Sequence, residues 1–304
     1  MRSTLILFLC MIQISLIAFF YEYVTVDKEN YINYAYESRD ILIYLFEGNL
    51  YKLIVNEPVW LIINILLTYI TDTEFVPLYI GLISYLISVL FIIKKVDKKY
   101  VFFILLLFFM PQIYKSYLVH LRQGLGVSIY LMAFLVEKKR NKFSLIFLSG
   151  LIHNSFIPIF FVHSLYELLF RKFSTKVIIA VNLILTLILA FYLFDILRVL
   201  GFRQNNYYEN VVLNNSGIGF LFWFIIFIIF LSSRRKIIRK NLICILPIGV
   251  YLIFYFINPV ASRLFESYII LIISSIIYLS KSKFLTTYGL LLSWAVFNNF
   301  LVNY

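Results

Sequence analysis

The sequence predicts an all-α fold, a polytopic helical bundle in a membrane with about eleven transmembrane helices, in a range of about ten to thirteen. Three observations predict it. Of the 304 residues, 62% are hydrophobic and only 14% are charged, whereas a soluble globular domain carries about 25% charged residues. The apolar residues gather in runs, and most basic residues lie in the breaks between them. A soluble core in a chain of this size could not bury so much apolar side chain.

The apolar runs give the candidate transmembrane spans. A helix needs about 20 apolar residues, with a range of about 17–25, to cross the hydrocarbon core of a bilayer. Several runs are shorter, and we expect their ends to extend into polar residues that face protein. The candidate spans are 4–21, 76–93, 100–113, 118–136, 143–156, 157–170, 177–195, 218–232, 242–258, 264–280 and 284–302.

The basic residues predict the orientation of these spans. Nineteen of the 27 Lys and Arg residues are Arg2 and the members of five clusters, which begin at Lys94, Lys138, Arg171, Arg234 and Lys281. The positive-inside rule assigns such clusters to the cytoplasmic side. An even number of candidate spans separates each cluster from the next. The sequence therefore predicts a multi-pass membrane protein with its N-terminus inside and its C-terminus outside.

Two sizeable outer loops are predicted, at 22–75 and 196–217, within a single membrane domain that covers 1–304. The first loop holds nine of the 15 acidic residues. Its stretches 41–55 and 58–70 are apolar but short, which favours helices lying on the outer leaflet. A hairpin that enters the membrane is the alternative, and it preserves the same topology.

Some basic residues remain on the outer side, where the charge rule disfavours them. Arg122 and Arg263 are the most informative, because each lies at the start of a predicted span. An arginine there either snorkels to the interface or binds an anion. Gly124 and Gly126 leave the helix face beside Arg122 bare, so that a bulky ligand or another backbone can come close.

His153 lies in the middle of the long apolar segment 143–170, where Asn154 and Pro158 predict a turn at the outer surface. A buried histidine is often only a hydrogen-bonded structural residue, and a catalytic base is the alternative. The sequence contains no zinc-binding spacing, no nucleophile elbow, no P-loop and no dinucleotide fingerprint. We therefore expect no metal and no cofactor. The placement of the basic clusters argues against nucleic acid as a partner.

Five segments, in their order along the chain, resemble the motifs of one family. Asp27–Tyr34 resembles Asp-x-x-x-Tyr-x-x-Tyr, and Asn56–Trp60 resembles a Glu-Pro-aromatic element. Leu121–Gly124 resembles Arg-Gln with a small residue, Gly150–Ser155 resembles His-x-Ser, and Ala261–Phe265 resembles a late arginine beside an aromatic residue. These features are similar to the EpsG family, which includes the Wzy-type polymerases of O-antigens, capsules and exopolysaccharides.

The resemblance implies a glycosyltransferase with a GT-C-like fold, which joins undecaprenyl-pyrophosphate-linked repeat units outside the cytoplasmic membrane. It implies the following roles: Arg122 and Arg263 bind pyrophosphate, His153 or Asp27 serves as the base, and Tyr31, Tyr34, Gln123 and Arg39 bind substrate. Lipid-linked glycans and membrane lipid are the implied partners, with a chain-length regulator and a flippase as further candidates.

Three other functions stay open on the sequence. A flippase or other transporter of lipid-linked sugars is usually longer and often shows internal repeats, and we find none in this sequence. A membrane acyltransferase that modifies a surface glycan can also use a histidine, but the outer arginines fit it less well. A purely structural membrane subunit does not explain these arginines.

Overall fold

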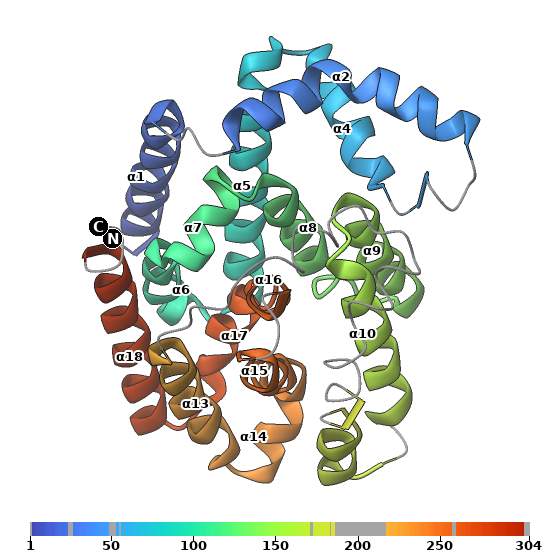
Figure 1. Cartoon of the computed structure of the whole chain (residues 1–304). Coiled ribbons are helices and arrows are strands. Elements are labelled where there is room, and N and C mark those ends of the chain that lie inside the picture. The colour runs from blue at the N-terminus through green and yellow to red at the C-terminus, as the bar shows by residue number, and fades with distance from the viewer. Residues whose placement is uncertain are drawn as a thin grey trace. The chain divides into compact units, whose positions relative to one another are not determined.

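The computed structural model describes residues 2–23, 27–48, 53–54, 56–170, 173–182, 184–185, 217–256 and 260–300. Within these ranges every regular element is a helix, which confirms the all-α class (Figure 1). The predicted outer loop 196–217 lies outside the described residues except for Gly217, and so does most of the predicted span 177–195.

The chain divides into two compact units, and each is described by itself. The first consists of Met1–Ile157 and Leu291–Tyr304, and the second of Pro158–Leu290. The single membrane domain expected over 1–304 stays a prediction.

The first unit carries the helices on which the candidate site is built. They include two short 3-10 helices, η1 and η2, and the end of the last helix, α18. Their bounds are α1 Arg2–Tyr23, α2 Lys28–Glu47, α4 Pro58–Thr68, η1 Thr73–Phe75, α5 Val76–Lys95, α6 Lys98–Leu106, η2 Leu107–Phe109, α7 Pro111–Leu118, α8 Leu121–Met132, α9 Lys139–Ile152, the start of α10 Phe156–Phe170, and α18 Lys281–Phe300.

Two helices in the described ranges are long and apolar enough to cross a membrane, and they support assignment as a membrane protein. They are Ser3–Glu22 and Thr73–Lys95. A third candidate is the pair Lys98–Phe109 and Pro111–Leu118, which is bent by 72°. The remaining apolar helices are shorter, so the total of eleven spans, the orientation and the GT-C resemblance stay predictions.

The bend at Pro111 divides what the sequence predicts as one span over 100–113. Proline has no N–H to donate and clashes with the preceding turn, so it starts a new helix here instead of continuing the old one. The side chain of Gln13 donates from Nε2 to the carbonyl oxygen of Leu105 at 2.9 Å. Asn299 donates from Nδ2 to the carbonyl oxygen of Phe109 at 3.0 Å. Polar side chains of α1 and α18 thus bind the backbone beside the break, as a bilayer interior requires.

Helices α5, α7 and α8 pack closely because glycines lie at their crossings. A Cβ atom on Gly81 would overlap the carbonyl oxygen of Tyr117, and a Cβ on Gly124 would overlap that of Ser116. A Cβ on Gly126 would press on the ring of Phe156. The sequence left open whether a bulky ligand or another backbone approaches the bare helix face beside Arg122. At Gly124 it is another backbone, that of Ser116.

Helices α2 and α4 lie side by side at one end of this unit (Figure 1). Their shared core contains Tyr31, Ala35, Trp60 and Leu61, and it continues onto the first turns of α5 through Val76 and Ile80. The opposite face of α2 is exposed and mixes aromatic with acidic residues. This amphipathic pattern is typical of a helix at an interface, and both the interfacial helices and the membrane hairpin stay predictions.

The second unit is built from apolar helices separated by one basic segment. The described elements are the remainder of α10, α13 Ile218–Leu231, α14 Arg235–Lys240, α15 Leu242–Phe254, α16 Val260–Glu266, α17 Ile269–Ser275, η3 Ile276–Tyr278 and the start of α18. Lys283 donates to the carbonyl oxygen of Ser232 at 2.6 Å. It binds the end of α13, where a helix leaves carbonyl groups without partners and a cation is favourable.

Candidate functional site

The centre of the site is Glu57, the residue that precedes α4. Its backbone has φ 58° and ψ 54°, the left-handed conformation. This conformation costs an L-residue roughly 1–2 kcal/mol, and a residue before proline is restricted further by the proline ring. Pro58 follows and begins α4. Strain of this kind persists where the surroundings impose it, and it gathers at functional sites.

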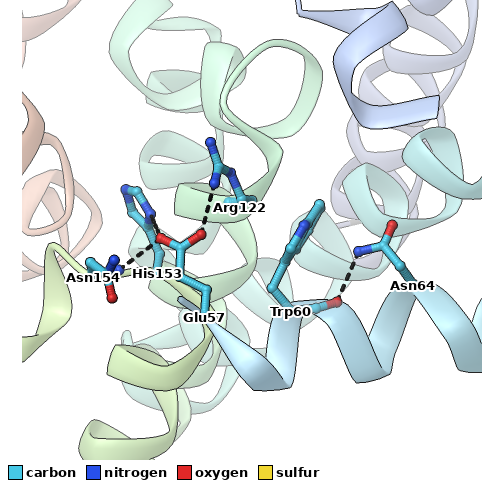
Figure 2. A network of polar contacts seen from close by, with 6 residues as sticks. All are labelled: Glu57, Trp60, Asn64, Arg122, His153 and Asn154. Atoms are coloured by element: carbon cyan, nitrogen blue, oxygen red, sulfur yellow. Dashed lines mark hydrogen bonds and ion pairs between the residues drawn. The ribbon is translucent and has the colours of Figure 1, made fainter. Parts of the chain in front are cut away.

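Three groups from distant parts of the chain bind the carboxylate of Glu57 (Figure 2). Arg122 donates from Nη1 to Oε2 at 2.7 Å. His153 Nδ1 lies 2.9 Å from Oε1, and the backbone N–H of Asn154 donates to the same oxygen at 3.1 Å. These partners are 65, 96 and 97 positions away in the sequence. The carboxylate therefore joins the starts of α4 and α8 to the turn between α9 and α10.

The break between α9 and α10 is what presents His153 and Asn154 to Glu57. Helix α9 ends at Ile152, and His153 is extended, with φ −148° and ψ 123°. Helix α10 begins at Phe156, so the turn falls where the sequence predicts it. The N–H of Asn154 lies just before this helix, where free N–H groups and the helix dipole favour a negative charge.

The carboxylate is ionised. Burial alone would raise its pKa, but the adjacent guanidinium of Arg122 and the hydrogen bonds from His153 and Asn154 outweigh burial and lower the pKa of Glu57 from 4.5 to about 2. The side chain of Glu57 is 6% exposed, while those of Arg122 and His153 are 23% and 12% exposed. The guanidinium and the imidazole are thus the more accessible parts of the cluster.

An ionised Glu57 fixes the tautomer of His153. A carboxylate can only accept hydrogen bonds, so Nδ1 must carry the proton that is shared with Oε1. Figure 2 shows the other side of the ring, which carries Nε2, turned away from Glu57. In the neutral ring Nε2 is then the acceptor and can take a proton from a substrate group. This is how a buried carboxylate orients a histidine base in other enzymes.

Two tyrosines of α2, Tyr31 and Tyr34, contact Arg122. Its guanidinium carbon lies 5.2 Å from the centre of the Tyr34 ring, within the range of a cation–π contact. Tyr31 and Tyr34 each meet the ring of Trp60 edge-on, with centroids 5.7 and 6.5 Å apart. Two of the predicted substrate-binding residues, Tyr31 and Tyr34, therefore lie close to Arg122, the residue that is predicted to bind pyrophosphate.

The other predicted site residues lie in different surroundings. Asp27 precedes α2 in a left-handed conformation with φ 61°, and its Oδ1 accepts a hydrogen bond from Asn30 at 3.2 Å. Arg39 is exposed on α2. Gln123 is buried, with 2% of its surface exposed. Arg263 lies on α16 in the second unit. The roles assigned to these four residues stay predictions.

Sequence reasoning gave Glu57 no functional role. The residue was visible only as part of Asn56–Trp60, in a segment expected to lie on the outer leaflet. The available signal was an acidic residue directly before a proline at the start of an apolar run. Within the described ranges, no group of three or more His, Cys, Asp or Glu side chains could hold a metal ion.

Comparison with known proteins gives one match. The model of the EpsG family matches residues 3–303, nearly the whole chain. No curated protein and no solved structure matches significantly.

Proposed function

Because the chain belongs to the EpsG family, we propose that it polymerises lipid-linked oligosaccharide repeat units at the outer face of the bacterial cytoplasmic membrane. Membership of the family suggests a role in exopolysaccharide biosynthesis. Glycosyl transfer from a polyprenyl pyrophosphate donor is the finer step that we add.

The proposed reaction transfers a growing glycan to the next repeat unit. A hydroxyl oxygen of the acceptor attacks the anomeric carbon of the donor and forms the new glycosidic bond. The bond from that carbon to the pyrophosphate oxygen breaks, and the pyrophosphate leaves with the electron pair. Nε2 of His153 takes the proton of the acceptor hydroxyl, and Glu57 stabilises the resulting imidazolium.

The observation that carries the proposal is the bridging of Arg122 and His153 by one ionised carboxylate. It supplies a base with a fixed tautomer beside a cation that can stabilise a departing anion. Arg122 uses Nη1 for Glu57, and a guanidinium has five N–H donors in all. Arg122 also forms a hydrogen bond with Tyr31, and the donors that neither Glu57 nor Tyr31 uses can bind phosphate oxygens. We propose Arg263 as a second pyrophosphate ligand, on its family motif alone.

The test is a chromosomal deletion complemented with wild type, His153→Gln or His120→Gln, followed by size analysis of the surface glycan. We expect long chains with wild type and only single capped repeats with His153→Gln. His120 lies two residues before Arg122 and has no role in the proposed chemistry, so His120→Gln should keep long chains. Equal membrane levels of the three proteins are checked by immunoblot.

The same experiment separates the rival functions. A flippase mutant would show no surface repeats at all. An acyltransferase mutant would keep long chains that lack an acyl group. Full-length chains with His153→Gln at matched protein level would refute the base role of His153, and full-length chains in the deletion itself would refute the polymerase.

A further inference from the structure

A cavity of about 720 Å³ lies in the first unit, between α18 and three segments that are candidate spans: Ser3–Glu22, Thr73–Lys95 and the bent pair of Lys98–Phe109 and Pro111–Leu118. Its wall is mostly apolar and includes Leu16, Phe20, Phe108, Leu118 and Ala295. This volume is within the range of about 300–1,000 Å³ that small-molecule sites in proteins occupy. The bend between η2 and α7 contributes to the wall on both of its sides, through Phe109 and Tyr114.

The depth of the cavity follows from two contacts of α1, one with η1 and one with α5. The hydroxyl of Tyr21 donates to the carbonyl oxygen of Glu74, which ties together the end of α1 and the start of η1 and α5. The hydroxyl of Tyr85 donates to Oε1 of Gln13 at 2.7 Å. Gln13 lies eight residues before Tyr21, or about 12 Å along the helix. With a hydrocarbon core of about 30 Å, Gln13 lies near the middle of the span.

The α1 residues of the cavity wall run from Gln13 to Phe20. The cavity thus occupies the half of the span that leads toward α2 and the candidate site. On the predicted topology this half lies in the outer leaflet. The two polar side chains that meet near mid-span, Gln13 and Tyr85, bind each other at the deeper part of the wall.

The cavity and the charged cluster lie at successive levels of the same helices. On α5, the shared core of α2 and α4 reaches Ile80, and Tyr85 on the cavity wall is about 8 Å further along the axis. Leu118 lines the cavity, and Arg122 follows four residues later, within roughly 14 Å even for an extended chain. On the predicted topology, the apolar cavity thus lies deeper in the membrane than the partly exposed guanidinium of Arg122. An anionic lipid has the same arrangement, with its charged headgroup above its apolar chain.

We propose that this cavity binds the first isoprene units of the polyprenyl chain whose pyrophosphate is bound at Arg122. The inference rests on the proposed function, since it takes the lipid class from there. The charge of Arg122 complements a phosphate headgroup, and the apolar wall excludes the glycan. Binding of the polyprenyl chain in the cavity fixes the depth of the pyrophosphate in the membrane. The scissile bond is then held beside His153.

The test is photolabelling of the purified full-length protein in nanodiscs by a polyprenyl pyrophosphate that carries a diazirine on its second isoprene unit. Mass spectrometry then locates the label. We expect it on α1 between residues 13 and 20 and on α18 between residues 292 and 299. Ala295→Phe places a ring in the cavity and should lower labelling about tenfold, since the ring occupies volume that the isoprene units need.

A matched control carries the same substitution outside the cavity. Ala18 is an exposed residue of α1, so Ala18→Phe should label as wild type does. Unlabelled polyprenyl pyrophosphate should compete, and a diacyl phospholipid at the same concentration should not. Equal competition by the phospholipid would mean that a structural bilayer lipid fills the cavity. That outcome, label elsewhere on the protein, or equal labelling of Ala295→Phe and wild type would each overturn the proposal.

The labelling result is independent of the glycan result. If deletion gives single capped repeats but no label reaches the cavity, the proposed polymerase function is confirmed and the proposed lipid-binding cavity is wrong. If the label reaches the cavity while the deletion leaves long chains, lipid binding in the cavity is confirmed and the proposed polymerase activity is wrong.

Discussion

Two regions of the first unit bury polar groups, and they do so in opposite ways. Between α5 and α8, buried serines bind carbonyl oxygens of their own helices. Ser84 donates to Ile80 at 2.7 Å, and Ser88 donates to Ser84 at 2.9 Å. Ser128 can donate to Gly124 at 2.9 Å or across the interface to Ser84 at 2.7 Å. At the site, by contrast, the carboxylate of Glu57 has no partner on α4 among the contacts described, and it depends on α8 and the α9–α10 turn.

This difference in hydrogen bonding distinguishes the packed helices of the scaffold, α5 and α8, from the candidate site at Glu57. A serine bonded to its own helix is satisfied as soon as the helix forms, so it permits close packing and demands nothing of the tertiary structure. A buried carboxylate needs several donors assembled around it before burial is tolerable. Such an arrangement is costly to maintain, which favours a functional reason for keeping it. The predictions below test this contrast, beginning with the largest expected effect.

Replacing Glu57 by Gln should have the largest effect, because it leaves Arg122 and His153 without their charge partner. Removing one member of a buried pair destabilises a protein by about 3 kcal/mol or more. We expect a lower melting temperature in detergent and single capped repeats in place of polymer. Glu47→Gln, at an exposed position of α2, is the control and should change neither. If Glu57→Gln is as stable as wild type, the buried carboxylate does not depend on its distant partners. The contrast between the site and the serine interface is then wrong.

Arg122→Lys should impair function strongly while affecting stability less. Lysine keeps the charge beside Glu57 but loses the planar fork that can bind a carboxylate and a phosphate together. We expect a stability loss of about 1–2 kcal/mol and greatly shortened glycan chains. Arg140→Lys, at an exposed position of α9, should behave as wild type. An arginine that only snorkels could be replaced by lysine without loss, so normal chains in Arg122→Lys would contradict pyrophosphate binding.

Acidification should destabilise the wild type through Glu57. Its pKa is about 2 in the folded state against an ordinary value of 4.5. The stabilisation is therefore fully present above pH 4.5 and is lost as the pH falls from 4.5 toward 2. The lost free energy of unfolding is on the order of 3 kcal/mol. Melting curves across this interval should fall more steeply for wild type than for Glu57→Gln, and parallel curves would show that Glu57 does not carry the dependence.

Ser128→Ala should have the smallest effect. The carbonyl oxygens that Ser128 binds belong to helices, so the loss is one ordinary hydrogen bond of about 0.5–1.5 kcal/mol. We expect a small drop in melting temperature and unchanged glycan length. Loss of polymer at normal protein level would mean that the serine interface takes part in function and would end its description as scaffold.

The sequence predicted the helical class, the turn at His153 and two of the three side chains in the cluster. Arg122 stood out because it breaks the charge rule, and His153 because a polar turn interrupts an apolar segment. Glu57 could not be identified in the same way, because its role comes from partners at 65 and 96 positions' distance. Neither periodicity nor hydropathy carries that information.

The bend at Pro111 was missed for a different reason. The run 100–113 has the length and composition of a short span, and the proline lies near its end. The bend depends on polar partners supplied by Gln13 and Asn299, from the opposite ends of the chain. Pro111 is a residue at which a helix can break, and the side chains of Gln13 and Asn299 bind backbone carbonyl groups beside the break.

The bond from Asn299 to the backbone beside that bend bears on how the protein is made. Synthesis runs from the N-terminus, so α6 and α7 leave the ribosome long before Asn299 does. Until Asn299 arrives, the carbonyl group of Phe109 must find another donor, such as water, the translocon or a chaperone. The contact of Phe109 therefore cannot form until α18 has been synthesised. Fusions or truncations near residue 299 should lower the yield of inserted protein, although the candidate site is built from residues made much earlier.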